Sequence, residues 1–232
     1  MKFEQTTTRL GTPLFVYPMP YLRSVVTGVL VFAGTRDEIS PHEDGLAHAL
    51  EHMVHKGNAR LPNSRAISGE IEADGGDINA WTSRELTFYH RTVPAYACGT
   101  AVASLESQLT SPLFRPEDIT TEMKNVIREI GDADDRPSSA CSELLSQALY
   151  AGHPLGKRTL GTEQSVSAFT AAHFAEWLER YYHPSNYAFV TVGNTTLAEA
   201  ERLHDSASFT PPHTAQRNVR ATLPFGGPFA PQ

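Results

Sequence analysis

The apolar and polar positions of the chain predict a sheet near its start and long helices after it. Short apolar runs over 12–18 and 24–33, punctuated by proline and glycine, predict two strands with hairpin-like connections. A third strand is expected over 76–92, which is rich in threonine and aromatic residues, and a fourth over 186–192.

Helical periodicity is found in several segments between these strands. The predicted helices span 42–56, 64–73, 95–109, 116–130, 138–150 and 170–182. Strands first, then several helices and then another strand is typical of an α+β fold. The segment 211–232 is rich in proline and glycine and predicts a linker or tail, so that one domain is expected over 1–210.

Composition excludes several classes of protein. The 232 residues carry a net charge of −7, which argues against a nucleic-acid partner, and no apolar run is long enough for a membrane span. The first residues lack the apolar core of a signal peptide, which favours a cytoplasmic protein. Cys98 and Cys141 have no metal-ligand spacing, so we expect two reduced core thiols.

Ten histidines are the unusual feature of the composition, and four of them fall in the helix predicted over 42–56. At about 100° per residue, one arc of this helix holds His48, Glu51, His52 and His55. Histidines at i and i+4 can both reach one zinc ion, and the glutamate before the second histidine can face a metal-bound water. This H-x-x-E-H order should arise by accident in roughly 3 % of such sequences. A solvated polar helix face is the alternative interpretation.

A third protein ligand is needed for a zinc hydrolase, and the helix over 116–130 offers one. Glu122 and Glu129 lie seven residues apart at the edge of its apolar stripe. Two carboxylates beside a buried face would repel each other, and a zinc ion would remove that difficulty. The alternative is a pair of ordinary surface glutamates.

Taken together, His48-x-x-Glu51-His52 and Glu129, with 76 residues between His52 and Glu129, resemble the inverted zinc-binding motif of the pitrilysin/insulinase family of metallopeptidases. The segments 29–38 and 79–89 also resemble family segments, and the similarity extends over about residues 7 to 205. The chain resembles the N-terminal catalytic half of the family enzymes and is similar to processing-peptidase-like members. The resemblance implies a mixed, largely antiparallel sheet packed against several helices.

The same resemblance implies a role for each matching residue. His48, His52 and Glu129 would bind one zinc ion. Glu51 would be the general base, and Glu122 would support the ligands without binding the zinc ion itself. Asn79 and Ala80 match the edge strand that pairs with extended substrate; without the resemblance, Asn79 would be a turn or bulge residue. His55 stands where the family usually has an aromatic residue. Two roles are open for it: a partner of the metal site, or a surface or packed histidine.

Family members build the working enzyme from two similar halves that enclose a chamber. The chain would therefore be a fragment or a short subunit that needs a second homologous half for full activity. We expect a zinc-dependent endopeptidase that hydrolyses peptides or unfolded protein segments. The alternatives are a noncatalytic homologous subunit for assembly or substrate capture, and a zinc-dependent binding module without turnover.

Overall fold

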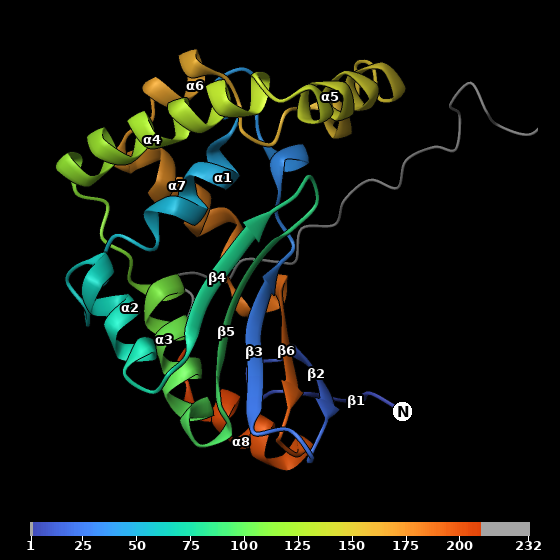
Figure 1. Cartoon of the computed structure of the whole chain (residues 1–232), viewed down its shortest axis with the longest axis vertical. Coiled ribbons are helices and arrows are strands. Elements are labelled where there is room, and N and C mark those ends of the chain that lie inside the picture. Colours follow the sequence, from blue (N-terminus) through green and yellow to red (C-terminus); the bar gives the residue numbers. More distant parts are fainter. Residues whose placement is uncertain (1, 210–232) are drawn as a thin grey trace, which may run out of the picture.

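The computed structural model describes residues 2–209 and contains one six-stranded sheet (Figure 1). Its strands are β1 (Glu4–Thr7), β2 (Pro13–Pro18), β3 (Ser24–Val31), β4 (Asp77–Thr82), β5 (Thr87–Pro94) and β6 (Tyr187–Gly193), in the order β1-β2-β6-β3-β5-β4. The β2–β6 pair is parallel and the other pairs are antiparallel. The predicted α+β class with a mixed, largely antiparallel sheet is confirmed. The predicted tail 211–232 lies outside the described residues.

The first two predicted strands are present, but the hairpin-like connection between them is wrong. β6 lies between β2 and β3, and its Phe189 is paired with both Leu14 and Val29. All three side chains are fully buried, so burial of apolar surface favours this arrangement. The polar strand β1 carries no apolar alternation and was not predicted.

The single strand predicted over 76–92 is wrong in a similar way, because it is the hairpin of β4 and β5. A tight turn interrupts the segment at Ser83, whose backbone N–H donates to the carbonyl of Leu86 over 2.9 Å. The Ser83 hydroxyl also accepts hydrogen bonds from the backbone N–H groups of Glu85 and Leu86. Such a side-chain oxygen stabilises a turn. The turn was missed because aromatic residues on both sides of it are typical of one continuous strand.

All six predicted helices are present with shifted ends. They are α1 (Leu46–Met53), α2 (Ser64–Glu72), α3 (Cys98–Thr110), α4 (Pro116–Asp134), α5 (Pro137–Leu149) and α7 (Ala171–Tyr181). Two shorter helices, α6 (Glu163–Ser167) and α8 (Leu197–Ser206), were not predicted. Four 3-10 turns complete the elements: η1 (Thr35–Asp37), η2 (Ala95–Ala97), η3 (Pro154–Gly156) and η4 (Pro184–Asn186).

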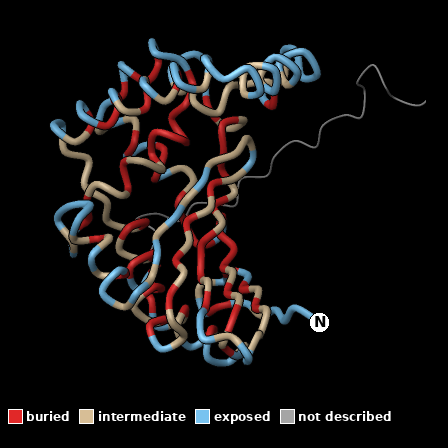
Figure 2. The backbone as a smooth tube through the Cα atoms, viewed as in Figure 1, coloured by how far each residue is buried: buried red, intermediate tan, exposed pale blue. Residues whose placement is uncertain are grey.

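The core lies between one face of the sheet and the helices that pack on it (Figure 2). It includes Val29 and Phe189 from the sheet and Leu50 and Trp177 from α1 and α7, all fully buried. Within residues 2–209, no helix combines the length and apolar character that a bilayer crossing requires.

The two cysteines do not share one environment. Cys98 is buried at the start of α3, as expected, but the prediction of a second core thiol is wrong because Cys141 is exposed. Cys141 lies on α5, a helix with no buried residue. The absence of a ligand spacing indicated a free thiol but did not determine whether that thiol is buried.

Candidate metal centre

The backbone of α1 begins at a fixed position because Glu38 caps it. The buried carboxylate accepts hydrogen bonds from the backbone N–H groups of Gly45 and Ala47, both at 3.0 Å. Gly45 has φ 89°, a left-handed conformation that favours glycine, and it places the helix start at Leu46. The helix is therefore shorter than the predicted 42–56, but the histidines keep their one-turn spacing.

His48 and His52 face one another across one turn of α1. Their Nε2 atoms lie 3.3 Å apart, and the rings meet edge to face with centroids 4.6 Å apart. Leu50 and Met53 on the opposite side of α1 are fully buried. The apolar side of the helix therefore fixes its rotation and directs both imidazoles toward α4.

The third group arrives from α4, which contacts α1 and starts with proline at its first position. Glu129 Oε2 lies 3.7 Å from His48 Nε2 and 3.6 Å from His52 Nε2. Among the described residues, these three side chains form a group whose ligand atoms all lie within 4.8 Å of one another. Two imidazoles and a carboxylate could hold one metal ion, and this donor set suits zinc.

The electrostatic environments of the two histidines differ, and that of His48 suits metal binding. Burial lowers the pKa of His48 to about 3, with a further contribution from His52, so that its imidazole is neutral at pH 7. Burial alone would lower the pKa of His52 as well, but the hydrogen bond with Glu122 raises it above its ordinary value. That bond joins His52 Nδ1 to Glu122 Oε1 over 2.8 Å and leaves Nε2 directed toward the other ligands.

Glu122 is not a surface glutamate, since its side chain is only 6 % exposed. Its Oε2 lies 2.5 Å from Lys56 Nζ and accepts a hydrogen bond from Asn125. Burial would raise the pKa of Glu122, but the hydrogen bonds with His52 and Lys56 lower it to about 2. The carboxylate is therefore ionised at pH 7 and holds Lys56 and the His52 ring in place.

Glu51 is held by the neighbouring strand. Its Oε2 accepts a hydrogen bond of 2.5 Å from the hydroxyl of Thr82 in β4. Burial raises the pKa of Glu51, which the hydrogen bond from Thr82 partly offsets. A carboxylate with a raised pKa beside a metal centre is suited to accept a proton.

A hollow extends from these groups along β4. It is lined by Glu51, His52, His55, Lys56, Ser68, Ile78, Asn79, Ala80 and Glu122. Asn79 and Ala80 thus lie beside the metal centre, in a regular strand at the edge of the sheet. The alternative of a turn or bulge at Asn79 is wrong, because Asn79 pairs in register with His90 of β5.

His55 is a packed histidine that also lines this hollow. Its Nδ1 donates to the carbonyl oxygen of Glu51 over 2.7 Å, and its ring lies 6.3 Å from that of Tyr89. Burial lowers its pKa to about 4. It does not belong to the group of candidate ligands.

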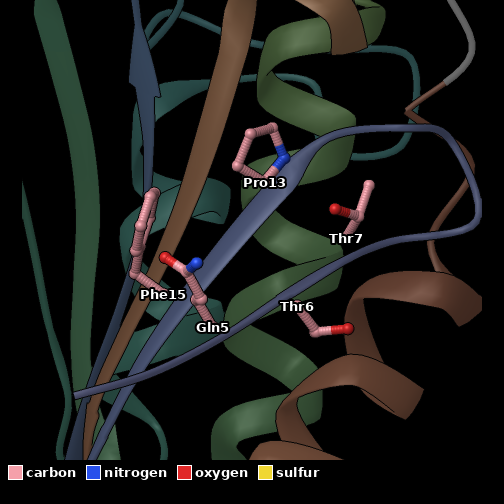
Figure 3. Close-up of a pocket in the computed structure, with 5 residues that line it drawn as sticks. All are labelled: Gln5, Thr6, Thr7, Pro13 and Phe15. Carbon is pink, nitrogen blue, oxygen red and sulfur yellow. The ribbon is translucent and has the colours of Figure 1, made fainter. Parts of the chain in front are cut away.

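Sequence reasoning missed Lys56 and Thr82 as supports of the site. Lys56 lies four residues after His52, a helical spacing that could have indicated it. Thr82 carries no such signal, because its contact with Glu51 depends on how β4 packs against α1. A separate hollow, at the opposite end of the sheet, is lined by residues of β1 and β2 without ionisable side chains (Figure 3).

Comparison with known proteins identifies the class to which this fold and site belong. Residues 18–163 match the family described as Insulinase (Peptidase family M16). An uncharacterized zinc protease from Rickettsia bellii is 32% identical over 208 residues, which cover 88% of this chain and 50% of the relative. The probable mitochondrial-processing peptidase subunit beta of Schizosaccharomyces pombe is 29% identical over 202 residues, with 87% and 44% covered. The chain belongs to the insulinase family of peptidases, M16.

Solved structures share the fold. The periplasmic protease PqqL from Escherichia coli superposes with a TM-score of 0.84 at 23% identity, over 95% of this chain and 25% of that protein. An M16 inactive domain from Pseudomonas fluorescens has the same TM-score at 16% identity, with 95% and 53% covered. The chain spans about half the length of the curated relatives it matches. Those relatives are named zinc proteases, in agreement with the metal that the candidate ligands suit.

Proposed function

We propose that this chain is the catalytic domain of a zinc endopeptidase, with His48, His52 and Glu129 as the zinc ligands. The observation that carries the proposal is the convergence of their three ligand atoms within 4.8 Å. Zinc, when bound, activates water and polarises the carbonyl of a peptide bond. The remaining roles fall to side chains of this chain.

In this proposal Glu51 is the general base. Its carboxylate takes a proton from the attacking water and afterwards gives it to the departing amine of the cleaved peptide. The Thr82 hydroxyl orients the carboxylate, and burial raises its pKa, which favours its uptake of the proton. Glu122 holds the His52 ring through Nδ1 and does not touch the substrate.

The substrate is proposed to be an extended peptide or an unfolded protein segment. β4 is the last strand of the sheet order, so its outer edge can pair with an added strand. Asn79 and Ala80 lie on this edge and line the hollow that reaches Glu51. A peptide paired there would pass beside the candidate ligands.

Full activity is proposed to need a second homologous domain or subunit, because the chain spans about half the length of its curated relatives. The test is a peptide-cleavage assay with and without a chelator, on the chain alone and together with the second half, with zinc content measured in parallel. Chelator-sensitive cleavage supports the proposal. A zinc-loaded pair of halves that cleaves no unfolded peptide would contradict it and favour the noncatalytic subunit.

A cytoplasmic location stays a prediction from the sequence. Fractionation of cells that express the tagged full protein tests it.

A further inference from the structure

The hollow beside the metal centre contains a histidine that the proposed reaction does not use. His55 lines this hollow, which has a volume of about 330 Å³. That volume is at the small end of ligand pockets and suits a single side chain of a bound peptide. The hydrogen bonding of His55 therefore bears on which side chain the hollow accepts.

The hydrogen bond of His55 Nδ1 fixes which ring nitrogen carries the proton. Its partner is the backbone carbonyl oxygen of Glu51, 2.7 Å away, which can only accept, so Nδ1 is protonated. Burial and the charge of Arg91 lower the pKa of His55 to about 4, so the ring is neutral at pH 7. In a neutral imidazole of this kind the other nitrogen, Nε2, is a hydrogen-bond acceptor.

This acceptor is open to a ligand. His55 Nε2 has no hydrogen-bond partner among residues 2–209, and it is not one of the unpartnered polar atoms that are closed off from solvent. Ser68 of α2 provides a second polar group in the same hollow. Its hydroxyl makes no hydrogen bond within the described part of the chain either.

The charged groups of the hollow, in contrast, already have partners. The Glu51 carboxylate accepts a hydrogen bond from Thr82. The Glu122 carboxylate is paired with Lys56 and His52. A charged side chain of a substrate would have to displace one of these partners, whereas a neutral side chain would leave all of them in place.

Two apolar side chains complete the lining. Ile78 and Ala80 alternate along β4 with exposed residues, so both face α1 and α2, which contact this strand (Figure 1). A peptide paired with β4 would continue this alternation, and every second side chain of the peptide would point toward the hollow. The methylene part of such a side chain would pack on Ile78 and Ala80 while its end reaches His55.

We propose that the hollow selects a substrate side chain that is neutral and donates a hydrogen bond, with glutamine as the best fit, and that His55 determines this preference. Glutamine offers its amide N–H to His55 Nε2, its amide oxygen to the Ser68 hydroxyl and its methylene groups to β4. A side chain of similar length without a donor would leave the acceptor unpaired, which disfavours its binding. The inference rests on the proposed function for the pairing of a peptide with β4.

Cleavage of matched peptides by the zinc-loaded chain together with its second half tests the preference. One guest residue, Gln, Met, Glu or Lys, is moved along an unfolded peptide, and mass spectrometry locates each cut. At one position relative to the cut, kcat/KM should be about tenfold or more higher for Gln than for the other three. His55→Phe should abolish the preference for Gln over Met. His42→Phe makes the same change at an exposed histidine outside the hollow and should leave the preference unchanged.

The absence of a Gln preference at every position, or a preference that His55→Phe leaves unchanged, would overturn the proposal. Ser68→Ala is the second variant in case His55→Phe fails to fold. It should lower the ratio of Gln to Met cleavage by about threefold or more, and an unchanged ratio would overturn the proposal as well.

A binding measurement separates this inference from the proposed function. If no peptide is cleaved, the proposed function fails, and fluorescence anisotropy with the same labelled peptides and the zinc-loaded protein still tests the selectivity of the hollow. The Gln peptide should then bind about tenfold more tightly than the Met peptide, and equal binding would overturn the inference.

Discussion

Substitution of Glu122 tests how much a residue that contacts a candidate ligand, without being a ligand itself, contributes to zinc binding. In the native chain this carboxylate contacts His52 Nδ1 at 2.8 Å and Lys56 Nζ at 2.5 Å. Glu122→Gln keeps the size of the side chain and removes its charge. We expect the variant to bind zinc more weakly because His52 becomes less basic and its ring less well oriented.

The magnitude follows from the hydrogen bond that is weakened. A bond to an ionised group contributes about 1.5–3 kcal/mol, which corresponds to a loss of about ten- to hundredfold in zinc affinity. The Lys56 side chain, which is 26% exposed, can turn toward water when its partner is neutral. The loss should therefore fall mainly on zinc binding and only weakly on the free energy of unfolding.

Competition with a chromophoric chelator measures the zinc affinity of the native chain and of the variant. Glu117→Gln is the matched control, since Glu117 is exposed in the first turn of the same helix. Urea unfolding shows whether each variant keeps its stability. A zinc affinity of Glu122→Gln within about twofold of the native value would refute the reasoning, because it lies well below the expected loss.

Three further predictions concern other groups. Glu51→Gln should keep zinc and lose peptide hydrolysis, and turnover near the native rate would contradict its role as base. His48→Ala or Glu129→Ala should lose zinc, as metal analysis of the purified variants can show; full occupancy in either would remove that residue from the ligand set. Burial lowers the pKa of His204 to about 4 from an ordinary 6.5, so the unfolded chain gains a proton first as the pH falls. Between pH 7 and 5, His204→Gln should therefore lose about 2 kcal/mol less of its free energy of unfolding than the native chain, as measured by urea titrations. The same pH dependence in both proteins would contradict this prediction.

The chemistry of the candidate site was open to prediction because it depends on local spacing. His48, Glu51 and His52 share one helix face, and helical geometry alone brings them together. Glu129 lies on a different helix; the apolar stripe of that helix indicated Glu122 and Glu129 as candidates, and the choice of Glu129 as the ligand depended on the resemblance to a family. The contact between Glu51 and Thr82 joins α1 to β4, and no spacing along the chain encodes it.

The fold, too, was predictable in part from the sequence. Helices with a regular apolar stripe, such as α4, were predicted because burial imposes a period on their sequence. The hairpin of β4 and β5 was missed because aromatic and threonine residues continue up to and beyond the turn at Ser83. The exposure of Cys141 was missed because the spacing of the two cysteines says nothing of which side of α5 faces solvent.

The position of β6 in the sheet has a consequence for how the protein is made. β2 and β3 emerge from the ribosome early, but the strand that joins them includes Phe189, more than 150 residues later. Until that strand is synthesised, the edges of β2 and β3 that it covers have no partner, and exposed strand edges favour aggregation. The nascent chain must therefore keep the unpaired edges of β2 and β3 from pairing wrongly until β6 has been synthesised.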